Sequence, residues 1–172
     1  MTIIGCTLWS SKSRDAYDIV QSKINDFKKI DDWNLQKHDE IHQVEAAWLR
    51  EQIITLLAKE GGQKPREILV ATHHAPCVAG TSHPDHSSNT GTVAFATDLI
   101  TQDGAQDGLD HVKVWAFGHT HYSTDTVRNG IRLVSNQRGY VIPGSTTPRA
   151  EHRDAGVGSG SRNFDITMTV PL

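Results

Sequence analysis

Cysteine is scarce in this 172-residue sequence, which contains only Cys6 and Cys77. Two cysteines do not make a disulfide framework, so a reduced, cytoplasmic setting is expected. Long apolar runs are absent as well, and none of the stretches present could span a membrane. Residues 1–9 lack both the basic leader and the long apolar core of a signal peptide, and they read as a strand instead.

Clustered positive charge is also missing. The formal net charge is -3 and there is no long run of Lys or Arg, so neither a nucleic-acid partner nor a membrane surface is indicated. The hydrophobic content of 37% is ordinary for a globular protein, and 172 residues suffice for one core. No internal repeat and no domain boundary is evident. We therefore expect residues 1–172 to form a single domain.

The predicted elements alternate in a way that indicates an α/β fold, with a mixed sheet, flanking helices and an antiparallel β region near the end. Asn129-Gly130 is a strong hairpin signal, because both turn positions require positive φ. Strands are predicted at residues 3–9, 68–71, 112–117, 124–128, 131–134 and 164–170, and helices at 15–30, 39–60 and 93–100.

The longest predicted helix is expected to begin with Asp39 as its N-cap and to end before Gly61-Gly62. Its apolar face is predicted to consist of Ile41, Val44, Trp48, Leu49, Ile53, Leu56 and Leu57. The tryptophans Trp9, Trp33, Trp48 and Trp115 are expected in the core, and the histidines His38, His42, His111 and His152 at the surface.

Ten histidines are many for this length, and two pairs of them follow predicted strands. His119 and His121 come after residues 112–117; on an extended backbone they would point to the same side, with Cα atoms roughly 6–7 Å apart. His73-His74 comes after residues 68–71. Histidines at two strand ends predict a metal site at one edge of the sheet.

The two histidine motifs carry a family resemblance. Residues 72–76 (THHAP) and 118–121 (GHTH) resemble the last two metal-binding motifs of the calcineurin-like metallophosphoesterases. Residues 5–10 resemble the strand that follows that family's Gly-Asn-His-Glu/Asp motif, residues 42–49 a helix that precedes the next strand, and residues 136–140 an element of a fungal-type branch. This resemblance implies part of an α/β-β/α sandwich that hydrolyses phosphate mono- or diesters with metal-activated water.

Carried over residue by residue, the resemblance makes His119 and His121 metal ligands. His73 is the better match for the earlier single ligand and His74 is the alternative; one of the two would bind metal while the other packs or touches substrate. Both are therefore candidate catalytic residues. The complete family site holds two divalent ions of the Mn, Fe or Zn type, and its partner is a phosphorylated substrate.

The departure from the family is large. Its Asp-x-His, Gly-Asp-x-x-Asp and Gly-Asn-His-Glu/Asp motifs do not occur before His73, so the chain is expected to correspond to the C-terminal half of such a domain. Imidazoles alone would leave two adjacent cations repelling each other, so at most one weakly held ion is expected, with the Zn, Ni or Cu preference of imidazole sites. Asp85 and Asp125 are the acidic residues nearest in sequence, but neither matches a family ligand.

Two readings follow from this. The first is a phosphoesterase that is inactive or impaired unless a missing N-terminal half, or a second copy in a homo-oligomer, supplies ligands. The alternative is a non-catalytic remnant that acts as a metal-binding or interaction module.

The remaining candidate residues have structural as well as functional interpretations. His83 and His86 are expected to be solvated, or to line a substrate entrance, and Cys77 to pack rather than to act as a nucleophile. Asn136, Arg138 and Tyr140 could contact phosphate, but a role in fixing the turn after the hairpin is favoured.

Overall fold

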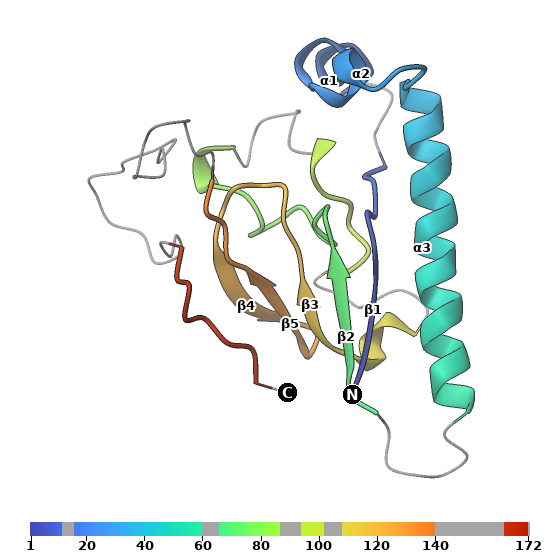
Figure 1. The fold of residues 1–172 in the computed structure, drawn as a ribbon, viewed down its shortest axis with the longest axis vertical. Coiled ribbons are helices and arrows are strands. Elements are labelled where there is room, and N and C mark those ends of the chain that lie inside the picture. Colours follow the sequence, from blue (N-terminus) through green and yellow to red (C-terminus); the bar gives the residue numbers. More distant parts are fainter. Residues whose placement is uncertain (12–15, 60–65, 87–93, 102–107, 140–163, 172) are drawn as a thin grey trace.

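The structure is a computed structural model that describes residues 1–11, 16–59, 66–86, 94–101, 108–139 and 164–171. Its centre is one five-stranded sheet with the strand order β1-β2-β3-β5-β4 (Figure 1). The strands are β1 (Thr2–Cys6), β2 (Ile68–Thr72), β3 (Val112–Ala116), β4 (Thr124–Arg128) and β5 (Ile131–Ser135). Among the described residues, no helix has the length and apolar character needed to cross a membrane.

The sheet is mixed, as the sequence predicts. Strands β1, β2, β3 and β5 pair in parallel, and β4 pairs with β5 in the antiparallel direction through the predicted hairpin. Asn129 and Gly130 have φ angles of 49° and 77°, which confirms the turn. Parallel strands end at the same edge of a sheet, so the residues that follow β2 and β3 are brought side by side there.

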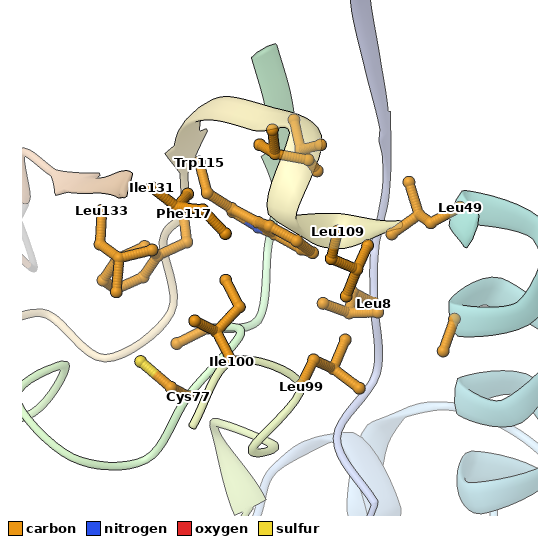
Figure 2. Close-up of a cluster of buried hydrophobic side chains, with 14 of the residues drawn as sticks. Leu8, Leu49, Cys77, Leu99, Ile100, Leu109, Trp115, Phe117, Ile131 and Leu133 are labelled. Carbon is orange, nitrogen blue, oxygen red and sulfur yellow. The ribbon is translucent and has the colours of Figure 1, made fainter. Parts of the chain in front are cut away.

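The core lies on one face of the sheet. Val70, Trp115 and Leu133 occupy neighbouring register positions on β2, β3 and β5, and all three are fully buried. Leu49 and Ile53 of helix α3 (Leu35–Ala58) join the same cluster from the side, as Figure 2 shows for Leu49. Burying each large apolar side chain contributes about 2 kcal/mol, which ties the helix to the sheet.

Helix α3 begins earlier than the sequence predicts. Asn34 is its N-cap: the backbone there is extended, and the side-chain oxygen accepts a hydrogen bond from the backbone N–H of Lys37 at 2.9 Å. Asp39 lies inside the helix, so the prediction that it caps the helix is wrong. The helix ends at Ala58, close to the predicted end.

The buried face of α3 also differs from the predicted one. Its buried residues are spaced three and four apart and include two imidazoles: Leu35, His38, His42, Ala46, Leu49 and Ile53. Val44 and Trp48, predicted to be core, are 68% and 40% exposed. His38 and His42 were predicted at the surface and are buried: aromatic rings pack around His38, and the ring of His42 donates a hydrogen bond to the carbonyl of Trp9. The predicted face is therefore confirmed at Leu49 and Ile53, and Leu56 and Leu57 pack against the same core, but the prediction is wrong at Val44 and Trp48.

Three further predictions need correction. The expected helix over 15–30 is broken into α1 (Tyr17–Lys23) and α2 (Asp26–Lys29). Residues 94–100 form no α-helix; they run beside the loop after β2, where the backbone of Ala75 exchanges hydrogen bonds with Phe95 and Thr97 at 3.0 and 3.1 Å. Residues 164–171 form no strand, and Ile166 is 86% exposed.

Candidate metal centre

Three histidines meet at the edge of the sheet where β2 and β3 end. His73, His74 and His119 each offer a ring nitrogen, and these atoms lie within 4.8 Å of one another. His119 Nδ1 and His73 Nε2 are 2.8 Å apart, a hydrogen bond in which one ring donates and the other accepts. This group draws one ligand candidate from the β3 end and two from the β2 end.

His74 forms the buried wall of the group. It is 1% exposed, and its ring stacks on that of His119 with centroids 4.2 Å apart and planes inclined by 24°. The indole of Trp9 packs against His74 at 5.3 Å, and His38 of α3 approaches it at 5.9 Å. Phe95 covers His119 at 4.9 Å. The rings are therefore held by packing on several sides.

The main chain fixes the two strand ends relative to each other. The carbonyl of Thr7, just beyond β1, accepts hydrogen bonds from the amides of His73 and His74 at 3.2 and 3.0 Å. The amide of Gly118 donates to the carbonyl of His73 at 3.0 Å. Because these bonds link the ends of β1, β2 and β3, the histidines cannot separate without breaking sheet-edge contacts.

A relay of two buried hydrogen bonds through the hydroxyl of Thr72 also fixes the strand ends relative to each other. The indole N–H of Trp115 donates to Thr72 Oγ1 at 2.9 Å, and the same hydroxyl donates to the carbonyl of His74 at 2.7 Å. Thr72 and Trp115 belong to β2 and β3, so the relay anchors the turn after β2 to its neighbouring strand. Leaving a buried indole N–H without an acceptor would cost about 1–3 kcal/mol.

The backbone around the site is unusual. Leu8, His119 and His121 have φ angles of 51°, 66° and 52°, in the left-handed region that non-glycine residues rarely adopt. The premise that His119 and His121 share one side of an extended strand therefore does not hold. His119 turns into the group, whereas His121 is exposed and lies outside it.

Electrostatics favour a neutral His73. Although His73 lies at the surface, the surrounding protein removes enough water from its ring to lower its pKa; Asp26 opposes this shift, and His121 adds to it. A neutral imidazole is the form that binds a metal ion. Asp26, in the first turn of α2, is thus a carboxylate whose charge reaches the site, and no sequence motif distinguishes it.

The two acidic residues nearest to the motifs in sequence are engaged elsewhere. Both Asp125 carboxylate oxygens accept hydrogen bonds from the Arg132 guanidinium, each at 2.9 Å. Asp85 lies 3.5 Å from a ring nitrogen of His83, whose ring in turn meets that of Tyr122 at 5.9 Å. Neither carboxylate belongs to the three-histidine group.

The other candidate residues are placed as follows. Cys77 is buried, and this burial raises the pKa of its thiol to about 11, so it is a packed thiol rather than an activated nucleophile. Asn136 pairs its side-chain amide with the backbone of Asp165 at 2.7 and 3.0 Å. Tyr140, His152 and the His86 side chain lie outside what the structure describes.

The three histidines form a donor set that could hold a metal ion. Their ring nitrogens lie within 4.8 Å of one another, and one of the three rings is buried. In the described part of the chain no carboxylate joins the group, so it offers no bridging ligand for a second ion.

No protein-family model matches this sequence. The chain is 31% identical over 152 residues to "Uncharacterized protein L509" of Acanthamoeba polyphaga mimivirus, covering 81% of this chain and 50% of that protein. Its fold is similar to that of the crystal structure of Phosphopantetheinyl Hydrolase (PptH) from Mycobacterium tuberculosis, with a TM-score of 0.54 and 13% identity over 81% of this chain and 50% of that one. The chain thus spans about half the length of both proteins. The α/β fold class predicted from the sequence is confirmed.

Proposed function

We propose that this chain carries one half of a metal-dependent phosphoesterase site, which hydrolyses phosphate mono- or diesters when a divalent cation is bound. The observation that carries the proposal is the group of His73, His74 and His119 at two adjacent strand ends. A fold similar to that of a hydrolase, together with the resemblance of the two histidine motifs, adds support. The assignment to a fungal-type branch rests on residues 136–140 alone.

A cation bound by this group would supply Lewis-acid chemistry: it lowers the pKa of a bound water and offsets charge on phosphoryl oxygens. His74 and His119 present rings that packing already holds in place, so they serve as ligands. His73 is the exposed member of the group, and in the proposal it both binds metal and faces the substrate. Its lowered pKa keeps the imidazole neutral near neutral pH, which is the form that binds a metal ion.

His121 has a separate place in the proposal. It is exposed, and its charge acts on His73, so it lies on the side from which a phosphorylated substrate would approach. A role as a further ligand stays a prediction from the motif, and a protonated His121 would also attract a phosphate. The carboxylate motifs of the family site do not occur in this sequence before His73, so we expect the chain alone to be impaired unless another polypeptide or a second copy of the chain supplies further ligands.

The test measures metal content and turnover together. The purified chain is loaded with Zn²⁺ or Mn²⁺, bound metal is counted by mass spectrometry, and hydrolysis of p-nitrophenyl phosphate is followed with and without EDTA. We expect about one Zn²⁺ per chain and a low rate that His119→Ala abolishes, with Asp125→Asn as a matched control. Metal-free protein without turnover at saturating Zn²⁺ and Mn²⁺ would contradict catalysis by this chain.

A second function is favoured by one observation: the described residues place no carboxylate in the histidine group. Such a site could bind metal without hydrolysing anything, as a metal-binding or interaction module. Stoichiometric Zn²⁺ without measurable turnover would support that alternative, and turnover that disappears with His119→Ala would exclude it.

A further inference from the structure

Trp9 is held against the site by helix α3 through both of its backbone polar groups. Its amide N–H donates to Glu45 Oε2 at 3.2 Å, and its carbonyl oxygen accepts a hydrogen bond from His42 Nδ1. Since a carbonyl can only accept, the proton of the His42 ring must sit on Nδ1. His42 and Glu45 are three residues apart on α3, so both face the same segment of chain.

The segment that they hold is the one that contacts the metal ligands. Thr7 accepts hydrogen bonds from the amides of His73 and His74, Leu8 takes a φ of 51°, and Trp9 lays its indole on His74. The left-handed backbone at Leu8 is strained and persists only where the surroundings hold it. The two bonds from α3 to Trp9 provide such a hold immediately beyond the strained residue.

Two further rings pack on the indole of Trp9. Trp33 packs on it at 4.7 Å and His38 at 4.9 Å, and His38 also approaches His74 at 5.9 Å. His74 also stacks on His119 at 4.2 Å. The ring of His74 thus contacts both Trp9 and a second ligand candidate, and the backbone position of Trp9 determines one of these two contacts.

We infer that His42 and Glu45 are positioning residues of the metal centre: by fixing the backbone of Trp9, they press its indole against His74 and hold that ligand ready to bind. This inference rests on the proposed function, because it assigns a ligand role to His74. Outer-shell partners that orient ligands are typically worth about 10- to 100-fold in metal affinity. Preorganisation explains the effect, since ordering the ligand is no longer a cost of binding.

The experiment compares Zn²⁺ affinity with stability in matched variants of the full chain. His42→Ala and Glu45→Ala each remove one bond to Trp9, whereas His42→Asn keeps a donor at the position of Nδ1 and Glu45→Gln keeps the acceptor oxygen. Ile53→Val, in the core face of the same helix, is the control for a general loss of stability. Affinity is measured by calorimetry with Zn²⁺, and stability by urea denaturation in EDTA.

We expect each alanine variant to weaken Zn²⁺ binding about tenfold, the Asn and Gln variants to restore it, and Ile53→Val to leave it unchanged while lowering stability. The inference is overturned if the alanine variants bind Zn²⁺ as the unmodified chain does. It is equally overturned if affinity simply follows stability through the whole set, Ile53→Val included.

A second measurement separates this inference from the proposed function. In metal-free protein, nuclear Overhauser effects between the Trp9 indole and the His74 ring should be present in the unmodified chain and in His42→Asn, and should be weakened in His42→Ala. If the unmodified chain bound no Zn²⁺ but showed this pattern, the metal centre would fail while the positioning of His74 stood. If His42→Ala does not fold, Glu45→Ala, which removes a single half-buried bond, gives the same comparison. Unchanged effects in every folded variant would refute the positioning role.

Discussion

The ends of β2 and β3 carry two histidines each, yet they use them differently. After β2, the adjacent residues His73 and His74 both enter the metal group, one at the surface and one buried. After β3, only His119 enters it, and His121 faces solvent. The β2 end is fixed by the amides bound to Thr7 and by the Thr72 relay, whereas at the β3 end positive φ angles turn the chain at both histidines. Local backbone direction, rather than spacing in sequence, decides which imidazoles converge.

The largest expected contrast lies within the β3 end. We predict that His119→Ala lowers Zn²⁺ affinity by at least about 100-fold, because it removes one of three ligands, and that His121→Ala lowers it by less than about tenfold. Isothermal calorimetry at pH 7.5 measures both. Equal losses from the two substitutions would mean that His121 is a ligand and that the metal-bound chain rearranges.

The anchoring of the β2 end is tested by Thr72→Val. Valine keeps the shape of threonine but cannot accept from Trp115 or donate to His74, so the free energy of unfolding should fall by about 2 kcal/mol in urea denaturation. Thr72→Ser retains the hydroxyl and should lose about half as much or less. If Thr72→Val were no more destabilising than Thr72→Ser, loss of the hydroxyl would cost no more than loss of one methyl group, and the relay would not be the main anchor of this strand end.

Cys77, a few residues beyond the end of β2, is buried, and we predict that it makes the stability of the fold depend on pH in the alkaline range. Burial raises the pKa of the Cys77 thiol from 9.0 to about 11, so folding favours the protonated form. The associated stability is fully present below pH 9 and is lost as the pH rises toward 11, by about 1–2 kcal/mol. Thermal unfolding from pH 8 to 11 measures this loss.

Cys77→Ala is the control, and it should flatten part of that decrease. The pKa of Cys6 is also raised to about 11, so a remaining slope is expected from that thiol. A pH profile that is identical with and without Cys77 would show that this thiol does not titrate differently in the folded and unfolded chains.

The smallest expected effect compares two carboxylates: Asp26, whose charge acts on His73, and Asp125, which is close to the histidine motif in sequence but outside the histidine group. Asp26→Asn should weaken Zn²⁺ binding a few-fold, because it removes a negative charge that acts on His73, and added salt should reduce the difference. Asp125→Asn should leave the affinity unchanged, since Asp125 is paired with Arg132. A larger loss from Asp125→Asn would place that carboxylate at the metal.

The sequence predicted the sheet better than the helices. Strand periodicity, Asn129-Gly130 and the apolar run before His73 located β2, β3 and the hairpin, because these signals are local. The buried stripe of α3 was predicted only in part. Leu49 and Ile53 were identified, but His38 and His42 were missed because they are classed as polar, although aromatic rings pack around His38 and the ring of His42 donates to the carbonyl of Trp9. The group of His73, His74 and His119 follows from parallel strands that end at one edge. His121 lies outside this group because the φ angles at His119 and His121 are positive, and the residue types do not predict such angles.

The parallel order of the strands also determines when the site can come into existence. Among the described strands, β4 and β5 pair through a tight turn, whereas β1 pairs with β2 across the whole of α3, and His73 meets His119 over a separation of 46 residues. Contacts between distant segments form late and slowly, since each requires the intervening chain to be closed into a loop first. A folding intermediate with only its hairpin and helices would therefore have no place for a cation. Acquisition of the metal would then mark completion of the sheet during refolding.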